Sequence, residues 1–262
     1  MSKTALISGA SSGIGLEIAN TMDKNGFTVI GLSRKKPNNV SYPYYECDLT
    51  NTNMIKDVTK QIIKDYPNID ILINCAGVGT GGAIEEISYE DLKWVYEVNL
   101  FGTIELTKGL LPSLKKANRS KIINIGSVAG AITIPYQTSY SMSKASLQVL
   151  SEGLRIELKQ FGISVTTVMP GDTKTNFTTN RKTILNENSP YYENVKRSIE
   201  KMEKDEQKGV PASKVVNTVL RVIKRKNPPV QVVVGFDYKL FVLLSSLLPK
   251  RLAQYIISKM YN

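Results

Sequence analysis

Short apolar runs alternate with longer amphipathic segments along most of this chain, and this alternation constrains the fold more than any other feature. Several runs, such as Ile71-Leu72-Ile73, are apolar without interruption, as in strands that are covered on both faces. The rhythm predicts an α/β fold with one doubly wound parallel sheet of about seven strands, flanked by helices. The expected strands are Thr4–Ser8, Thr28–Leu32, Tyr44–Cys47, Ile69–Asn74, Lys121–Gly126, Ser164–Met169 and Val230–Val234, and the expected helices are Gly13–Asn25, Asn51–Asp65, Ser88–Asn99, Gly102–Lys116, Ser139–Phe161 and Ala212–Lys226.

Two segments depart from this rhythm, although residues 1–262 are expected to form a single domain. Residues 173–208 are polar and then strongly charged, which predicts a mobile loop and a solvated helix that together form a lid over the substrate. Residues 236–262 form an amphipathic C-terminal extension, in which Phe241, Leu244, Leu247 and Leu248 share one helical face. Such a tail packs on its own core or on a dimer partner, or alternatively lies on a membrane surface.

The composition excludes several classes of site. The 262 residues include no histidine, which removes histidine triads and imidazole zinc sites, so we expect no metal. The two cysteines, Cys47 and Cys75, cannot form a disulfide framework. No apolar run approaches the roughly 20 residues that a spanning helix needs, and the N-terminus carries no signal-like apolar segment. We therefore expect a cytoplasmic protein, with membrane association through the tail left open.

The net charge of +11 is concentrated in the last third of the chain. Residues 174–262 hold 17 basic and 7 acidic side chains, whereas residues 1–173 hold 17 and 16. This excess indicates either an ordinary solvated surface or attraction to anionic lipid or an acidic substrate. Nucleic acid is not expected as a partner, because no aromatic-basic interleaving or recognition motif accompanies the charge.

A glycine-rich turn joins the first expected strand to the first expected helix. Its first glycine permits a tight turn, the second lets the backbone approach a pyrophosphate, and the third allows close packing of helix on strand. The position between the first strand and the first helix makes this turn a predicted dinucleotide-binding site. Its candidate contacts are Gly9, Ser11, Ser12, Gly13, Ile14 and Gly15.

The end of the second expected strand indicates which dinucleotide is bound. An Asp or Glu there would bond the ribose hydroxyls of NAD, but the segment contains Ser33 and Arg34 and no carboxylate. Ser33 can hydrogen-bond a 2′-phosphate, and Arg34 can grip it through its planar guanidinium. We therefore predict NADP(H) rather than NAD(H) as the cofactor.

Tyr140 and Lys144 lie four residues apart in an expected helix, so their side chains share one face. A lysine ammonium one turn from a tyrosine favours the phenolate and lowers the pKa of the phenol from its ordinary value of about 10. Ser127, at the end of an expected strand, can donate a hydrogen bond to the same substrate oxygen. The three residues therefore predict acid-base chemistry at a carbonyl.

At this point the chain resembles the short-chain dehydrogenase/reductase family over nearly its whole length. The resemblance rests on seven pieces in family order: Ser8-Gly-Ala-Ser-Ser-Gly-Ile-Gly15, Asp48-Leu49, Asn74-Cys-Ala-Gly77, Val98-Asn99, Ser127, Tyr140-x-x-x-Lys144 and Pro170-Gly171. Two positions depart from the family pattern. Ser8 replaces the usual Thr, which keeps the hydroxyl, and Cys75 replaces the usual second Asn, which puts the local hydrogen bonding in doubt.

The resemblance implies a Rossmann-type fold and a role for each matching residue. Tyr140 would be the general acid/base, Ser127 would orient the carbonyl oxygen, and Lys144 would bind the nicotinamide ribose. Asn99 would hold a water in a proton relay, and Asp48 would contact adenine. Three of these pieces also have structural alternatives, in which Asn74 ties strands together, Asn99 caps a helix and Pro170-Gly171 is only a turn that ends a strand. The remaining implied cofactor contacts are Leu49, Ala76, Gly77, Pro170, Gly171, Thr173 and Thr175.

The tail and the segments around Glu152–Leu158 and Pro170–Thr175 are similar to the hydroxysteroid and retinol dehydrogenase branch of that family. The implied function is interconversion of a carbonyl and an alcohol on an apolar, steroid-, retinol- or lipid-like substrate. A 3-oxoacyl-[acyl-carrier-protein] reductase is the enzymatic alternative, and an NADP-sensing or scaffolding protein is the alternative without catalysis. The resemblance also implies a homodimer or homotetramer.

Overall fold

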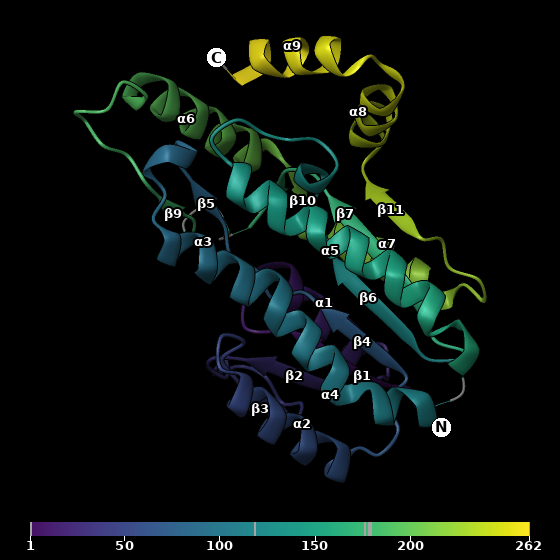
Figure 1. Ribbon diagram of the computed structural model, residues 1–262. Coiled ribbons are helices and arrows are strands. Elements are labelled where there is room, and N and C mark those ends of the chain that lie inside the picture. The colour runs from purple at the N-terminus through teal and green to yellow at the C-terminus, as the bar shows by residue number, and fades with distance from the viewer. Residues whose placement is uncertain (1, 118, 176, 178–179, 262) are drawn as a thin grey trace.

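The computed structural model describes residues 2–117, 119–175, 177 and 180–261, and its centre is a seven-stranded parallel sheet (Figure 1). Across the sheet the strands run in the order β11-β7-β6-β4-β1-β2-β3, which confirms the predicted doubly wound Rossmann-type fold. The strand order reverses between β1 and β4, which is where such sheets bind their ligands. The bounds are β1 Thr4–Ser8, β2 Thr28–Ser33, β3 Tyr44–Glu46, β4 Ile71–Asn74, β6 Lys121–Ile125, β7 Ser164–Pro170 and β11 Gln231–Val234.

Helices cover both faces of this sheet, because successive residues of a strand point to opposite sides. Ala5 and Ile7 of β1 belong to one buried apolar cluster with residues of α1 (Gly13–Lys24) and α7 (Ala212–Lys224). Leu6 lies on the other face, in a cluster with residues of α2 (Thr52–Asp65) and α4 (Gly102–Lys116). The long α5 (Thr138–Glu157) packs on β7 beside α4. The sheet is therefore buried on both sides, as its uninterrupted apolar strands predict.

Two helices that the sequence predicts as separate form one continuous helical segment. α3 (Tyr89–Tyr96) passes through a π-helical turn, Glu97–Phe101, directly into α4. The predicted break after Asn99 is therefore wrong. Gly102 does not mark a break between helices. Its lack of a side chain lets the continuous helical segment approach the residues after β3, because a Cβ at Gly102 would lie 2.4 Å from the Leu49 carbonyl oxygen.

The segment 173–208 is tied to the body of the protein at several points. Its first part forms β8 (Thr173–Lys174), which pairs with β10 (Val210–Pro211), and β9 (Lys182–Thr183), which pairs with β5 (Thr80–Gly81). Its helix, α6 (Tyr192–Lys208), is not simply solvated: Val195, Ile199 and Met202 are buried in a small cluster with Ala83. Asn176, Thr178 and Thr179 of this segment lie outside the described residues, as do Met1, Asn118 and Asn262.

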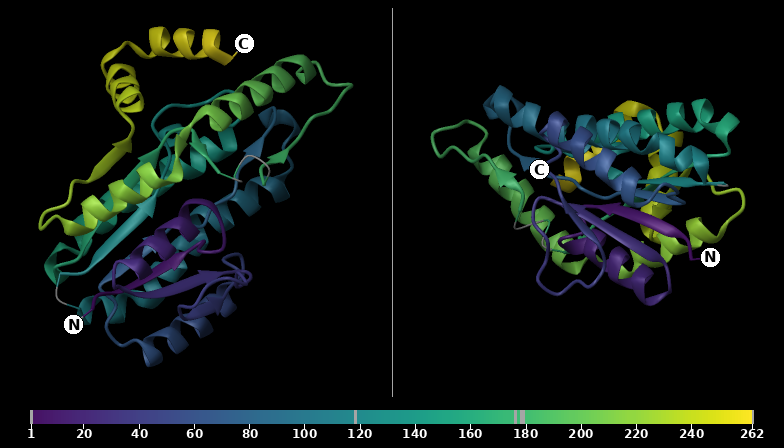
Figure 2. Two further views of the ribbon diagram at one scale, coloured as in Figure 1. Left: turned by 180° about the vertical axis from the view of Figure 1, so that it is seen from behind. Right: turned by 90° about the horizontal axis from the view of Figure 1, so that it is seen from below.

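The C-terminal extension forms two further helices, α8 (Phe236–Leu247) and α9 (Lys250–Tyr261). Figures 1 and 2 show them, in yellow, beyond the end of the sheet at which β11 terminates, with α9 near α6 and apart from the two helical layers. Within the described residues, no helix is both long and apolar enough to span a membrane.

Candidate functional site

A cleft of about 1020 Å³ opens along the ends of β1, β2, β4, β6 and β7. It runs from the glycine turn, past the end of β2, to the start of α5, and the lid segment and the tail line its far side. All but two of the predicted site residues line it. The lining residues that the sequence predicted are Gly9, Ser11, Ser12, Gly13, Ile14, Gly15, Ser33, Arg34, Asp48, Leu49, Ala76, Gly77, Ser127, Tyr140, Lys144, Pro170, Gly171, Thr173 and Thr175.

The glycine turn has the close approaches that its sequence predicts. Gly9 and Gly13 have positive φ angles of 70° and 52°. A Cβ at Gly9 would lie 2.7 Å from the Ala76 amide nitrogen, and one at Gly15 would lie 2.2 Å from the Gly9 carbonyl oxygen. The α1 N-cap residue, Ser12, makes no capping hydrogen bond with its side chain. The N-terminal amides of α1 therefore meet the cleft without a side-chain cap, which suits an anion.

The two departures from the family pattern lie together beside this turn. The Ser8 hydroxyl accepts hydrogen bonds from the backbone amides of Cys75, at 3.1 Å, and Ala76, at 3.3 Å. Ser8 therefore uses the hydroxyl that it shares with Thr, and the segment after β4 is held to β1 through the Cys75 backbone. Burial raises the pKa of the Cys75 thiol to about 12, so this residue is a poor nucleophile.

Hydroxyl and cationic groups gather at the end of β2. Arg34 is exposed and lines the cleft with Ser33 and Lys35. The Ser33 hydroxyl donates to the Lys35 carbonyl at 2.8 Å and also bonds the Tyr44 hydroxyl. Glu46 of β3 is the register partner of Ser33. It accepts from the Lys36 amide at 3.0 Å and is not among the described residues that line the cleft. Arg34 and Lys35 therefore place positive charge at this end of the cleft.

Asp48 lies at the same side of the cleft, after β3. Its Oδ1 accepts from the Thr50 amide at 2.9 Å and from the Thr50 hydroxyl at 3.0 Å. These bonds orient the carboxylate and leave its other oxygen for a ligand. The place agrees with the predicted adenine contact, which stays a prediction.

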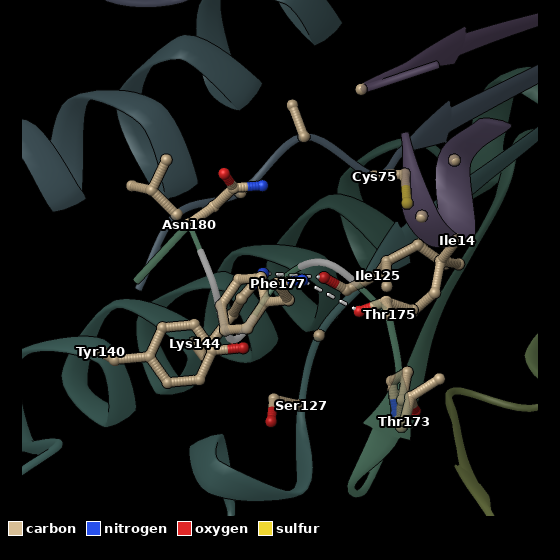
Figure 3. Close-up of a pocket in the computed structure, with 18 of the residues that line it drawn as sticks. Ile14, Cys75, Ile125, Ser127, Tyr140, Lys144, Thr173, Thr175, Phe177 and Asn180 are labelled. Atoms are coloured by element: carbon tan, nitrogen blue, oxygen red, sulfur yellow. Dashed lines mark hydrogen bonds between the residues drawn. The ribbon is translucent and has the colours of Figure 1, made fainter. Parts of the chain in front are cut away.

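Tyr140, Ser127 and Lys144 converge on the middle of the cleft (Figure 3). The Tyr140 ring points into the cleft and packs against Phe177 of the lid segment, with ring centroids 5.6 Å apart. Thr175 fixes the backbone of this segment by accepting a hydrogen bond from the Phe177 amide at 3.2 Å. The phenol therefore lies between Ser127 and a lid-segment aromatic ring.

The acid-base balance of this site differs from the sequence-based expectation. Burial raises the pKa of Tyr140 to about 12, and the hydrogen bond with Ser127 acts in the opposite direction. Lys144 is not among the groups that shift this pKa: its Nζ donates to the Ile125 carbonyl at 3.0 Å and lies 5.8 Å from the Tyr140 ring centroid. Burial also lowers the pKa of Lys144 to about 8. The predicted lowering of the Tyr140 pKa by Lys144 is therefore wrong for the protein's own groups, because desolvation outweighs the lowering by Ser127 and Arg181.

Asn74 and Asn99 are the two predicted site residues that do not line the cleft. Asn74 donates to Asn124 at 2.8 Å and to Thr107 at 3.2 Å, and so ties β4 to β6 and α4, as in its structural alternative. Asn99 sits in the π-helical turn and does not cap a helix. It accepts from the Val78 amide at 2.8 Å and donates to the Val78 carbonyl at 3.0 Å and the Ser143 hydroxyl at 2.9 Å. The predicted water relay is untested; what Asn99 does is link the segment after β4 to α5.

Sequence reasoning missed most of the substrate side of the cleft. Its residues come from four separate parts of the chain that carry no motif, so only their tertiary placement identifies them. Gln137 is the N-cap residue of α5, just before the predicted helix, so helical spacing did not indicate it either. The additional lining residues are Trp94, Ile132, Ile134, Gln137, Asp172, Phe177, Asn180, Glu206, Tyr238, Phe241, Ile257 and Tyr261.

Two polar contacts hold the lid segment and the tail over this side. Arg181 and Glu206, near opposite ends of the lid segment, form a buried ion pair. The Tyr238 hydroxyl of α8 donates to Asp172, just before β8. Burial raises the pKa of Asp172, whereas the bond from Tyr238 lowers it. The tail is thus attached to the wall of the cleft.

Comparisons with known proteins identify relatives of this chain. Residues 3–185 match the family model described as short chain dehydrogenase. A 3-ketodihydrosphingosine reductase of Bacteroides thetaiotaomicron is 38% identical over 98% of this chain and 97% of its own length. Dehydrogenase/reductase SDR family member 7B of Xenopus laevis is 31% identical over 93% of this chain and 77% of its own length. Among solved structures, a short-chain dehydrogenase from Streptomyces avermitilis superimposes with a TM-score of 0.83 at 29% identity, with all of both chains covered.

Proposed function

This chain belongs to the short-chain dehydrogenase/reductase family, and from that premise we propose that it is an NADP(H)-dependent oxidoreductase acting on an apolar, lipid-like carbonyl or alcohol. The observation that carries the proposal is the convergence of Tyr140, Ser127 and Lys144 on the cleft that begins at the glycine turn. One end of the cleft thus suits a dinucleotide, and its middle suits proton transfer.

The residues present fit a dinucleotide. The absence of a side chain at Gly13 and the uncapped amides of α1 would let the pyrophosphate approach the backbone. Asp48 would contact the adenosine, and Lys144 and Thr175 would face the nicotinamide end. When bound, the reduced cofactor supplies a hydride to the carbonyl carbon, and the oxidised cofactor accepts one from the alcohol.

Residues of this chain carry out the proton transfer. In the reducing direction Tyr140 donates its hydroxyl proton to the carbonyl oxygen, and Ser127 donates a hydrogen bond to the same oxygen. A raised Tyr140 pKa keeps the phenol protonated at neutral pH, which suits a general acid. Lys144, held by the Ile125 carbonyl, places a positive charge beside the developing phenolate.

The preference for NADP(H) rests on Arg34. Its exposed guanidinium lines the cleft at the end of β2, where Lys35 adds a second positive charge. A 2′-phosphate carries charge that this pair can bind, whereas an unphosphorylated ribose offers it only hydroxyls.

Two features support an apolar, long-chain substrate. The substrate side is lined largely by aromatic and aliphatic side chains, among them Trp94, Ile132, Phe177 and Phe241. A relative that is similar over its whole length carries the name 3-ketodihydrosphingosine reductase, which denotes reduction of a ketone on a long-chain lipid. We propose a substrate of this chemical kind: a ketone on a long alkyl chain.

The test is NADPH oxidation with a panel of 3-ketodihydrosphingosine, steroids, retinal, 3-oxoacyl thioesters and small aldehydes. The proposal expects the largest kcat/KM on long-chain ketones. Highest kcat/KM on acyl-carrier thioesters would support the alternative 3-oxoacyl-[acyl-carrier-protein] reductase, and no turnover of any member would support a sensor or scaffold. Tyr140→Phe should lower kcat by at least about a hundredfold while NADPH binding is kept, and Tyr89→Phe, at an exposed position, is the control.

We further propose a homo-oligomer that pairs through α4 and α5. Met142, Val149 and Ile156 recur every seven residues on α5, and all three are exposed. Such a stripe suits a partner helix. Val149→Glu combined with Ile156→Glu should lower the molar mass measured by light scattering to that of one chain, whereas an unchanged mass would contradict this proposal.

A further inference from the structure

The two helices of the C-terminal extension expose an unusual amount of apolar surface. Phe236 and Leu247 are 78% and 72% exposed, and Leu243 is 54% exposed. No residue of α8 or α9 is fully buried. The exposed apolar side chains of this outer face are Phe236, Leu240, Leu243, Leu244, Leu247, Leu252, Tyr255, Ile256 and Met260.

The inner face of the same helices contacts the rest of the protein. Tyr238 and Phe241 of α8 and Ile257 and Tyr261 of α9 line the cleft, and Tyr238 is fixed by its bond to Asp172. Tyr261 also packs against the buried cluster of α6. The tail therefore already packs on its own protein with one face, and the apolar side chains of its outer face stay exposed. Figure 1 shows α8 and α9 at the outer edge of the molecule.

Positive charge surrounds this outer face. Lys239, Lys250, Arg251 and Lys259 are all exposed, whereas Asp237 is the one acidic residue of the extension 236–262. A second copy would bring the same charges against these, which disfavours pairing of two tails. An apolar face bordered by lysine and arginine instead complements a bilayer whose headgroups are anionic.

We propose that α8 and α9 dock this protein on the surface of an anionic lipid bilayer. The apolar side chains enter the region between headgroups and acyl chains, and the basic residues meet lipid phosphates. Each helix has 12 residues, too few to span a bilayer, so the helices lie on the membrane. Because their inner face lines the cleft, docking brings the substrate side of the site next to the lipid that would carry an apolar substrate.

The experiment is flotation of the full chain with vesicles of phosphatidylcholine alone or with about one-third phosphatidylglycerol. Binding should be strong on the mixed vesicles, weak on the neutral ones, and reduced by salt. Leu243→Glu combined with Leu247→Glu should lower the vesicle-bound fraction at least about tenfold. Lys250→Gln combined with Arg251→Gln should lower binding to anionic vesicles by about fivefold per charge removed.

Matched controls lie outside the tail. Ile84→Glu combined with Tyr89→Glu places the same two negative charges at exposed apolar residues, and Lys56→Gln with Lys60→Gln removes two exposed charges of α2. Both controls should bind like the unaltered chain. Circular dichroism and reduction of a water-soluble carbonyl should be unchanged in the Leu243/Leu247 variant, since neither residue lines the cleft.

The proposal is overturned if the unaltered chain does not float with anionic vesicles, or if the Leu243/Leu247 variant floats equally well. It is also overturned if that variant loses oligomer mass in the absence of lipid, because the outer face then contacts a second copy. Flotation requires no catalysis, so failure here is distinguishable from failure of the proposed reductase activity.

Discussion

Arg181 forms a buried ion pair with Glu206 that joins two distant parts of the lid segment beside the phenol of Tyr140. The Arg181 side chain is 1% exposed, and its Nε and Nη1 are buried without a hydrogen-bond partner in the described part of the chain. The pair therefore stabilises the lid segment only while both charges are present. It also acts on the Tyr140 pKa, which Glu206 raises and Arg181 lowers.

Replacing Arg181 should destabilise the protein strongly. Arg181→Met leaves the largely buried Glu206 without this cation, at a cost of about 3–5 kcal/mol in the free energy of unfolding. The control is the next residue: Lys182 is 54% exposed in its pair with Asp91, and Lys182→Met should cost at most about 1 kcal/mol. Urea unfolding measures both values, and equal losses for the two variants would show that burial of the Arg181 pair does not matter.

The pH dependence of reduction should reflect Lys144. Because burial lowers the pKa of Lys144 to about 8, the ammonium predominates below pH 8 and the neutral amine above it. Tyr140, with a pKa raised to about 12, stays protonated throughout. We expect the rate of carbonyl reduction to be constant to about pH 8 and then to fall as the lysine charge is lost. A pH-rate profile at saturating NADPH checks this, and a rate unchanged to pH 10 contradicts it.

The lowered pKa of Lys144 also predicts how the stability of the fold depends on pH. Above about pH 8 the rate should fall, whereas the contribution of Lys144 to stability should rise. The folded pKa of Lys144 lies below the ordinary 10.5, so between about pH 8 and 10.5 the unfolded chain binds more protons at this residue. Its contribution to stability therefore rises with pH across that window. Lys144→Met removes the contribution, so the difference in unfolding free energy between the two proteins should change between pH 8 and 10; a difference independent of pH would refute the shifted pKa.

Cofactor preference should depend on Arg34. Arg34→Asp places a carboxylate where a 2′-phosphate would bind. Because one charge-assisted hydrogen bond is lost, KM for NADPH should rise at least about tenfold. KM for NADH should fall, because the carboxylate can bind the ribose hydroxyls. Lys36→Asp, two residues on, is the control, because Lys36 is exposed and is not among the lining residues. An unchanged ratio of the two KM values in Arg34→Asp would assign the preference to other groups.

The sheet could be predicted from the sequence because its signals are local. Short apolar runs set β1, β4 and β6, and the observed ends lie within about two residues of the predicted ones. The two-residue strands β5, β8, β9 and β10 were not predicted, because a pair of residues carries no periodicity and becomes a strand only when the lid segment lies beside another part of the chain.

The candidate site also has parts that local sequence patterns predict and parts that depend on tertiary structure. The glycine turn and the Tyr140–Lys144 spacing are local patterns, and both lie at the cleft as expected. The pKa balance of Tyr140 was not predictable, because desolvation depends on Phe177 and the rest of the lid segment, which are distant in sequence. The place of Asn99 depends on a π-helical turn that joins two predicted helices, and the sequence pattern suggested a break there.

The inner face of α8 should set the preference for long substrates. Phe241 lines the cleft, so Phe241→Ala removes apolar contact that only a long chain would reach; burial of one such side chain corresponds to about 1.5–3 kcal/mol. KM for a long-chain ketone should therefore rise at least tenfold while KM for a small aldehyde stays the same. Leu243→Ala, on the outer face of the same helix, should change neither value when both substrates are assayed in solution without vesicles. Steady-state kinetics on the two substrates separates the cases. If both KM values rise together in Phe241→Ala, Phe241 supports the binding of every substrate and does not select for a long alkyl chain.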